Sequence, residues 1–343
     1  MNEQTLKATA AAMTADAKGL LAMDESNPTA DKRFAALGIP QTRETRRAYR
    51  DMIVTAPGLA ESISGAILYD ETIRSTTFAD VPFAQALQKV GIIPGIKVDG
   101  GTRLLALHDG ELVTEGLDGL RERLAEYAGM GARFAKWRAV ITIADARNAP
   151  SRGCIEANAH ALARYAALCQ EADIVPIVEP EVLMDGDHGL ARCAEVTGRT
   201  LHAVFDALRA QRVLLEGMVL KPNMVVPGLK CPMQAAVDEV ADATIAVFRR
   251  AVPAAVGGIA FLSGGQSAQD ASARLNAMHQ RHGHELPWPL AFSFARAIQD
   301  PAMKAWAGRQ ENVAVAQKAL VERARLNRLA RRGEYTVAME TPH

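Results

Sequence analysis

The stretch FAKWRAVITI (134–143) shows the pattern that decides the fold predicted for this chain of 343 residues. It is a short apolar run, and seven similar runs recur at intervals of roughly 30–45 residues, about the size of one strand-plus-helix unit. The eight runs cover residues 19–24, 63–69, 92–98, 134–143, 174–182, 213–220, 256–262 and 290–294. Between them, apolar residues repeat every three or four positions, as in Leu162, Tyr165, Ala166 and Cys169, which is the spacing of an amphipathic helix.

This alternation of apolar strands with amphipathic helices is typical of a parallel β-sheet covered by helices. Eight units without a linker predict an α/β fold, a (β/α)8 TIM barrel, as one domain over residues 1–343, with an open doubly wound sheet as the alternative. Extra helical segments are expected at 3–18 and 302–331, and a C-terminal tail over about 334–343. After the seventh run, Ser267 and Asp270 have the spacing of a helix N-cap.

The composition excludes several classes of protein. Hydrophobic residues make up 49% and charged residues 23%, as in ordinary globular proteins, and 39 basic residues balance 39 acidic ones. A chain without net charge has no overall field that attracts nucleic acid or an anionic membrane, so we expect neither as a partner. The longest uncharged stretch, 251–269, contains four glycines, a proline and several polar residues, and is therefore not a membrane span.

Two further features concern the cellular compartment. Residues 1–19 carry both signs of charge and no compact apolar core, so no signal peptide is predicted. The four cysteines show no CxxC motif or other short pairing, which favours free thiols in a reducing compartment. We therefore expect a cytoplasmic protein.

Polar and charged residues occupy the end of every apolar run, where a TIM barrel places its active site. Burying charges there is costly unless they are paired, so an ordinary strand would not end in this way. Strand residues two apart share a face, and therefore Lys136 and Arg138 are expected to point together, as are Glu179 and Glu181. In chain order the terminal residues are Asp24-Glu25-Ser26, Asp70-Glu71, Lys97 and Asp99, Lys136 and Arg138, Glu179 and Glu181, Lys221, Ser263-Gly264-Gly265, and Arg296.

Three lysines inside apolar runs, Lys97, Lys136 and Lys221, carry the strongest chemical signal. A desolvated lysine near other cations has a lowered pKa, and its neutral amine is a nucleophile toward carbonyl groups. Carboxylates such as Asp24 and Glu179 on neighbouring strands can move protons while an imine forms and breaks down. The alternative is a network of salt bridges at the barrel mouth, and spacing alone does not choose the nucleophile among the three lysines.

Two groups of residues are candidates for binding anions. Ser263-Gly264-Gly265 follows the seventh run and precedes a helix, so backbone N–H groups and the helix N-terminus can face a phosphate. Together with Arg296 it occupies the position at which TIM barrels commonly bind phosphate. Lys97 and Arg138 are candidates for a second anion on the far side.

These residues, in this order, resemble the class I fructose-bisphosphate aldolase family over about residues 18–336. The most specific motifs are FAKWR (134–138), VPIVEPE (175–181), LKPNM (220–224) and FLSGGQS (261–267), and LLAMDES (20–26), ILYDET (67–72) and GIKVDGG (95–101) also match. The resemblance implies reversible aldol cleavage of fructose 1,6-bisphosphate to dihydroxyacetone phosphate and glyceraldehyde 3-phosphate through a lysine Schiff base, in glycolysis and gluconeogenesis. It further implies a TIM barrel that assembles as a homotetramer and uses no metal or other cofactor.

The resemblance also implies a role for each matching residue. Lys221 in LKPNM is the Schiff-base lysine, Lys136 assists proton transfer, and Glu179 is the main acid/base, with Glu181 as its neighbour. Asp24 helps to activate the C4 hydroxyl. The remaining matches are expected to bind substrate: Ser263, Gly264 and Arg296 the ketone-side phosphate, and Lys97 and Arg138 the other phosphate. Arg33 and Ser26 are expected to contact substrate as well, and so is Thr29, where the chain departs from a serine of the family.

The chain departs from the family pattern in places that affect substrate preference and one proton transfer. The muscle-type branch ends in a tyrosine that protonates the enamine, whereas this chain ends in TVAMETPH (336–343). We expect that removing residues 337–343 slows cleavage by no more than a factor of about three. The family's SYGR is SFAR (293–296) here, which leaves open the preference between fructose 1,6-bisphosphate and fructose 1-phosphate. Two rival functions remain, an aldolase for another phosphosugar and a non-catalytic scaffold.

Two clusters are expected to lie outside the site. His279, His282 and His284 form an HxxHxH pattern, but surface histidines are favoured over a metal site there. Five arginines between 323 and 332 are interpreted as the solvated end of a helix rather than a nucleic-acid site.

Overall fold

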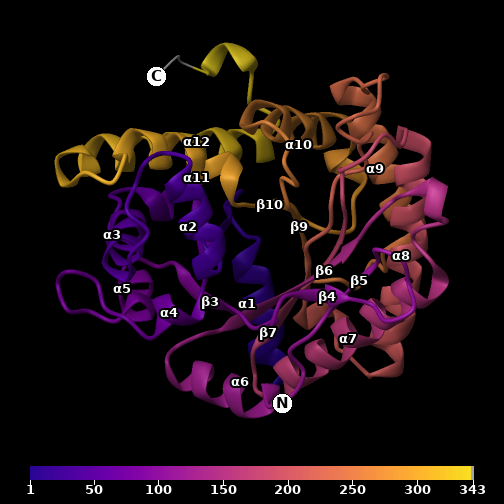
Figure 1. The fold of residues 1–343 in the computed structure, drawn as a ribbon, viewed down its shortest axis with the longest axis horizontal. Coiled ribbons are helices and arrows are strands. Elements are labelled where there is room, and N and C mark those ends of the chain that lie inside the picture. The colour runs from indigo at the N-terminus through magenta and orange to yellow at the C-terminus, as the bar shows by residue number, and fades with distance from the viewer. Residues whose placement is uncertain (341–343) are drawn as a thin grey trace.

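Eight parallel strands close into a barrel in the computed structural model, which describes residues 1–340 (Figure 1). Around the barrel they follow the order β1-β10-β9-β8-β7-β6-β3-β2, so the first and last strands pair and no edge is left open. This closure confirms the barrel and rejects the open sheet. The strands are β1 (Gly19–Ala22), β2 (Ile63–Leu68), β3 (Ile93–Lys97), β6 (Phe134–Ile141), β7 (Val175–Val182), β8 (Val219–Leu220), β9 (Ile259–Phe261) and β10 (Leu290–Phe294).

Helices surround this barrel, and further helices precede its first strand and follow its last. They are α1 (Glu3–Met13), α2 (Asn27–Ala35), α3 (Arg43–Val54), α4 (Asp70–Ile73), α5 (Phe83–Lys89), α6 (Leu120–Gly129), α7 (Arg152–Glu171), α8 (Leu190–Ala210), α9 (Val237–Ala251), α10 (Ala268–His282), α11 (Arg296–Trp306) and α12 (Val313–Arg331). As expected, Ser267 caps α10 by accepting a hydrogen bond from the backbone N–H of Asp270. None of the helices within residues 1–340 is long and apolar enough to cross a membrane.

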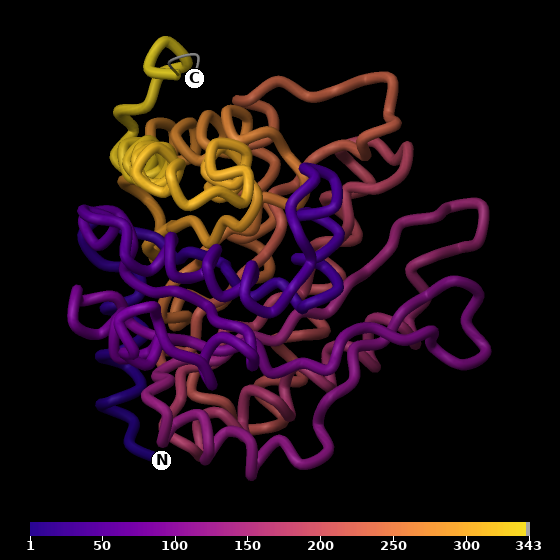
Figure 2. The backbone as a smooth tube through the Cα atoms, turned by 60° about the vertical axis from the view of Figure 1, so that its left-hand side comes forward, coloured from indigo at the N-terminus to yellow at the C-terminus, as the bar shows by residue number. Residues whose placement is uncertain are grey.

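Two short elements lie outside the barrel scheme. A hairpin of β4 (Thr102–Leu104) and β5 (Leu112–Thr114) follows β3, and Figure 2 shows this part of the chain extending away from the barrel. The helical turn Val337–Met339 stands at the opposite extreme of the molecule from the N-terminus. The final residues 341–343, which complete the predicted tail, lie outside the described residues.

The floor of the barrel is closed by α1. Its buried residues Leu6, Ala10 and Met13 form one cluster with residues that point into the barrel from the strands, among them Phe134. The ring of Phe134 fills the space that a side chain on β3 would need, since a Cβ at Gly95 would lie 2.2 Å from it. Apolar side chains therefore fill the lower barrel, and the charged residues at the strand ends lie at its other end.

Three predicted boundaries are wrong. The run 213–220 forms a strand only at Val219–Leu220, because residues 215–217 turn in a 3-10 helix. The segment 3–18 stops being helical at Met13, since Asp16 and Ala17 have φ values of 54° and 57°. The segment 302–331 is not one helix. It spans the end of α11 and all of α12, which are separated where Ala307 and Gly308 take φ values of 48° and 74°.

The arginine-rich segment is only partly a solvated helix end, which corrects the prediction. Arg323 is buried and forms an ion pair with Glu340, and it also donates to the hydroxyl of Ser272. Arg331 is buried as well and donates from both terminal nitrogens to the carbonyl of Thr14, 3.1 Å away. These two side chains fasten α12 to the tail and to the end of α1, so they are structural contacts.

Candidate active site

A cavity of about 240 Å3 opens at the carboxyl ends of the barrel strands. Its wall contains twelve of the thirteen predicted site residues, from seven strands or the loops that follow them. Those residues are Asp24, Ser26, Thr29, Lys97, Lys136, Arg138, Glu179, Glu181, Lys221, Ser263, Gly264 and Arg296.

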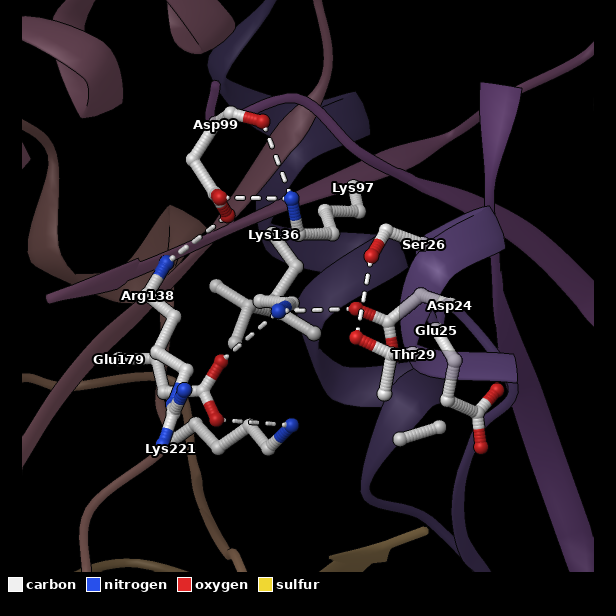
Figure 3. Close-up of polar contacts among 12 residues, drawn as sticks. Asp24, Glu25, Ser26, Thr29, Lys97, Asp99, Lys136, Arg138, Glu179 and Lys221 are labelled. Carbon is white, nitrogen blue, oxygen red and sulfur yellow. Dashed lines mark hydrogen bonds and ion pairs between the residues drawn. The ribbon is translucent and has the colours of Figure 1, made fainter. Parts of the chain in front are cut away.

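Two lysines and two carboxylates form a continuous chain in the wall of this cavity (Figure 3). The Nζ atom of Lys221 lies 3.1 Å from Oε1 of Glu179, and the other oxygen of Glu179 lies 3.3 Å from Nζ of Lys136. Lys136 also contacts Oδ2 of Asp24 at 2.8 Å. No more than 11% of any of these four side chains is exposed. They form one network of ion pairs that reaches across β1, β6, β7 and the end of β8.

The network fixes the charge of two of its members. Burial alone would raise the pKa of Asp24, but the charges of Lys136, Lys221 and Lys97 outweigh it and hold that pKa at about 2. Burial alone would lower the pKa of Lys136, yet Asp24 and Glu179 raise it well above its ordinary value. Lys136 is therefore charged at neutral pH and unsuited to nucleophilic attack, whereas it can hold a positive charge beside Lys221.

The strand register explains why these side chains meet. Lys136 and Arg138 are two residues apart on β6, and Glu179 and Glu181 are two apart on β7, so each pair faces the cavity as predicted. Arg138 stands directly beside Glu179 in the register, and its guanidinium binds Glu181. Lys221 follows immediately after the two-residue strand β8, where its backbone N–H still donates to the carbonyl of Val178 at 2.8 Å.

One end of the cavity has the character of an anion site. Gly264 and Gly265, with φ values of 60° and 98°, turn the chain between β9 and α10 in a conformation that favours glycine. Arg296 begins α11 on the opposite side of this turn, and no ion pair or hydrogen bond joins its side chain to any residue within 1–340. A free guanidinium beside a glycine turn is well suited to a phosphate.

The second predicted anion site has its cations engaged by carboxylates. Lys97 Nζ lies 2.7 Å from Oδ1 of Asp99, and Arg138 binds Glu181. Asp99 also receives hydrogen bonds from the backbone N–H groups of Arg138 and Gly101, so it holds this corner of the cavity together. Both cations still line the cavity.

The structure does not place Arg33 in the wall of this cavity. Its guanidinium lies between Glu25 and Asp300, with Nη2 at 2.8 Å from Oδ1 of Asp300. Ser26 and Thr29 do reach the cavity from the first turn of α2, and their hydroxyl oxygens are 3.0 Å apart. Arg33 thus stands one layer behind Glu25, which does line the cavity.

Comparison with known proteins identifies the family to which this chain belongs. A sequence model of the class-I fructose-bisphosphate aldolase family matches residues 5–343. The chain belongs to the class I fructose-bisphosphate aldolase family. The probable fructose-bisphosphate aldolase class 1 of Xanthomonas campestris pv. campestris is 55% identical over 336 residues, covering 98% of this chain and 99% of that protein. The cytoplasmic isozyme of fructose-bisphosphate aldolase from Cicer arietinum is 49% identical over 331 residues, covering 96% and 91%.

A solved structure agrees with this assignment. The fructose-bisphosphate aldolase of Plasmodium falciparum, determined in complex with TRAP and a small-molecule inhibitor, superposes with a TM-score of 0.95 at 45% identity. The match covers 97% of this chain and 95% of that one. The family shown by the comparisons is thus the one that the sequence motifs predict.

Sequence reasoning missed several residues of this aldolase cavity. Ala22 and Leu262 are apolar and gave no signal, whereas Ser293 and Ala295 belong to the SFAR stretch (293–296) but were not among the predicted site residues. The hydroxyl of Ser293 is buried and has no hydrogen-bond partner within residues 1–340. Glu25 and Asp99 were visible at the ends of their runs, but only the structure shows that they organise Arg33 and Lys97.

The HxxHxH histidines of this aldolase have other partners. His279 is largely buried and its Nε2 lies 3.2 Å from the carbonyl oxygen of Leu290, so the prediction of a surface position is wrong for this residue. His282 Nε2 lies 2.7 Å from Oδ1 of Asp242 on α9. His284 is exposed. His279 and His282 thus have different hydrogen-bond partners.

Proposed function

We propose that this class I aldolase cleaves fructose 1,6-bisphosphate reversibly through a Schiff base on Lys221, as a step of glycolysis and gluconeogenesis. One observation carries the assignment of residues, namely the buried chain Lys221–Glu179–Lys136–Asp24 between two cation-bearing ends of a single cavity. A bisphosphate sugar has a reactive ketone between two dianions, and this arrangement is complementary to it.

The first half of the reaction forms the imine. The neutral amine of Lys221 attacks C2 of the open-chain ketose, and a proton passes from nitrogen to the former ketone oxygen. Glu179, 3.1 Å from Lys221, has taken up the proton that the lysine gave up on becoming a neutral amine, and donates it to that oxygen, which leaves as water. The iminium that remains is the electron sink for the next step.

The second half breaks the C3–C4 bond. A carboxylate, Asp24 or Glu179, takes the C4 hydroxyl proton, C4 becomes the aldehyde of glyceraldehyde 3-phosphate, and the bonding electron pair moves into the iminium to give an enamine. Protonation at C3 and hydrolysis of the renewed iminium then release dihydroxyacetone phosphate. Ser263, Gly264 and Arg296 hold the ketone-side phosphate and Lys97 and Arg138 hold the other, which fixes the sugar against the network.

Borohydride trapping tests the nucleophile. Reduction in the presence of dihydroxyacetone phosphate should add one adduct per chain, and peptide mass spectrometry should locate it on Lys221. The Lys221→Met variant should give no adduct, whereas Lys97→Met should still be modified at Lys221. An adduct on Lys136 or Lys97 in the wild-type enzyme would refute the assignment. Activity that survives treatment with EDTA would support metal-independent catalysis.

The rival functions predict different substrates. Turnover of fructose 1,6-bisphosphate and fructose 1-phosphate should be compared with that of other ketose phosphates. Full activity on another phosphosugar and none on these two would favour the aldolase rival, and no turnover on any would favour a scaffold. The intact network supports the catalytic function.

In this proposal, the oligomeric state and the cellular location of the protein rest on the family resemblance. We expect one barrel domain per chain, a homotetramer and a place in the cytoplasm, and no partnership with nucleic acid or membrane. Static light scattering after gel filtration should give four times the chain mass of 36.8 kDa. A monomer at micromolar concentration would contradict the tetramer.

A further inference from the structure

The chain that carries Lys221 leaves the barrel sheet as soon as β8 ends. β8 has only two residues, and its register with β7 and with β9 ends at Leu220. The regular pairing of strands thus stops before residues 221–225, although Lys221 has to reach Glu179 on β7 (Figure 3). The backbone groups of Lys221 and Pro222 still make one hydrogen bond each to the neighbouring strands or loops, and side chains supply the other anchors of this segment.

Asn223, two residues after Lys221, continues the connection to β7 with its side chain. Its Oδ1 atom accepts a hydrogen bond of 3.0 Å from the backbone N–H of Val182, at the point where β7 extends beyond the end of β8. Its Nδ2 atom donates to Oγ1 of Thr197 on α8 at 3.2 Å and to the carbonyl of Met224 at 3.1 Å. Asn223 is only 4% exposed, so water cannot easily replace these partners, and the amide is costly to disturb.

The position of Asn223 suggests an indirect part in the chemistry. It is not among the described residues that line the substrate cavity, whereas Lys221 and Glu179 both are. Its partner Val182 belongs to the same strand as Glu179, and that strand is paired with β6 along its whole length. The amide therefore joins the segment with the nucleophile to the strand with the acid/base. The 3.1 Å contact between Nζ of Lys221 and Oε1 of Glu179 depends on this alignment.

We propose that Asn223 is a positioning residue for the lysine nucleophile. Its amide, held by Thr197, fixes the segment 221–225 against β7 and so keeps the amine of Lys221 within reach of Glu179. This inference rests on the proposed function, because it takes Lys221 as the group that attacks the ketone. A displacement of about 1 Å at a reacting group can reduce a rate by about a hundredfold. The proposed phosphate-binding residues lie on other elements, so loss of the anchor slows imine formation and leaves substrate binding nearly unchanged.

Substitutions of Thr197 test the anchor without touching Asn223 itself. Thr197→Val keeps the shape of the side chain and removes the acceptor for Nδ2 of Asn223, whereas Thr197→Ser keeps the hydroxyl and removes a methyl group. For cleavage of fructose 1,6-bisphosphate, kcat should fall about tenfold in Thr197→Val, with KM within about threefold of wild type. In Thr197→Ser, kcat should stay within about twofold of wild type. Asn223→Ala removes all three hydrogen bonds and should lower kcat by about a hundredfold.

Thr200→Val is the matched control for Thr197→Val. Thr200 lies about one turn further along α8 and is also buried, but its hydroxyl has no hydrogen-bond partner within residues 1–340. The same exchange of side chains at this position should therefore leave kcat within about twofold of wild type, because no hydrogen bond is lost. A tenfold loss in this control as well would show that kcat responds to any change in the packing of α8, which would refute the role of the anchor.

Borohydride trapping separates this inference from the function on which it rests. When enzyme is mixed rapidly with dihydroxyacetone phosphate and then reduced, Thr197→Val should form the Lys221 adduct about tenfold more slowly than wild type but to the same final extent. If both proteins form it equally fast, the positioning role is refuted and the proposed function stands. If Thr197→Ser is slowed as much as Thr197→Val, the threonine methyl matters rather than the hydrogen bond, and the positioning role is again refuted. A wild-type enzyme that forms no adduct on Lys221 would overturn both.

Discussion

The charge on Lys136 keeps the pKa of Asp24 near 2 against the effect of burial. The Lys136→Met substitution removes the main opposing charge, so burial should raise the pKa of Asp24 and the acid limb of the pH–rate profile should move upward. We expect kcat to fall by about a hundredfold, the scale of a disturbed acid–base group. Lys136→Arg retains the charge and should leave the acid limb near its wild-type position. A fall in kcat with an unmoved limb would show that Lys136 does not control Asp24.

Ser293 offers a test of a cavity residue that was not among the predicted site residues. Its buried hydroxyl lines the cavity near Arg296 and has no hydrogen-bond partner within residues 1–340. In Ser293→Ala the KM for fructose 1,6-bisphosphate should rise about tenfold, since a hydrogen bond to a charged group contributes about 1.5 kcal/mol. The melting temperature should not fall, because no bond within the protein is lost. A lower melting temperature with an unchanged KM would assign Ser293 a structural role instead.

Individual residues were predictable where charge interrupts an apolar strand. The two-residue spacing of Lys136 with Arg138 and of Glu179 with Glu181 placed all four in one cavity, because strand geometry dictates which residues share a face. Arg33 could not be placed in this way, since helix α2 lies outside the barrel and its packing depends on Glu25 and Asp300. Ser293 resembles any small residue in a strand, and its missing partner is visible only in three dimensions.

The contact of His279 on α10 with β10 predicts that the stability of the fold decreases in acid. Burial, together with the charge of Arg331, lowers the pKa of His279 to about 4. The unfolded chain has the usual pKa near 6.5, so between these two values the unfolded state binds more protons than the folded state. The contribution of neutral His279 to the free energy of unfolding is therefore fully present above about pH 6.5. It is lost as the pH decreases, by about 2 kcal/mol at pH 5.

Urea unfolding at pH 7 and pH 5 measures this loss. His279→Gln keeps a donor for the carbonyl of Leu290 but cannot take up a proton, so its stability should change less over the same range. His284→Gln, at an exposed position, should behave like wild type. The same loss of unfolding free energy between pH 7 and pH 5 in all three proteins would rule out His279 as its source.

A second prediction at the level of elements concerns the junction of α3, α11 and β1. Gln299 is fully buried, accepts a hydrogen bond from Tyr49 at 2.9 Å and donates to the carbonyl of Ala22. Tyr49→Phe leaves the amide oxygen of Gln299 without its donor, which should lower the free energy of unfolding by about 1–3 kcal/mol. Chemical denaturation gives the value, and a change below about 0.5 kcal/mol would show that the amide finds another partner.

Elements were predictable where periodicity is strong, and their ends were not. The eight apolar runs correspond to the eight barrel strands because a strand buried on both faces has to be apolar. The break between α11 and α12 was missed because Ala307 is a good helix former by type, and it is the left-handed turn that it forms with Gly308 that stops the helix. The two helices α2 and α3 between β1 and β2 also exceed the simple strand-plus-helix unit.

At the scale of the whole molecule, the opposite ends of the cavity should recognise different phosphates. Arg296→Ala should impair turnover of both fructose 1,6-bisphosphate and fructose 1-phosphate, because both carry the ketone-side phosphate. Lys97→Ala should raise the KM for the bisphosphate by about tenfold and leave the 1-phosphate within about threefold, since a charge-assisted hydrogen bond contributes a few kcal/mol at most. Steady-state kinetics with both substrates measures the ratio, and equal losses in Lys97→Ala would contradict a cavity with two separate phosphate ends.

The bond between Arg331 and the carbonyl of Thr14 joins residues 317 positions apart, and β1 likewise pairs with β10 near the other end of the chain. A ribosome that adds about 5–20 residues per second needs roughly 15–60 s to make the intervening sequence. For that interval α1 has no barrel to seal, and Leu6, Ala10 and Met13 remain accessible to water and to other nascent chains. The barrel therefore closes only after translation is nearly complete, and until then its N-terminal helix lacks the surface that buries it.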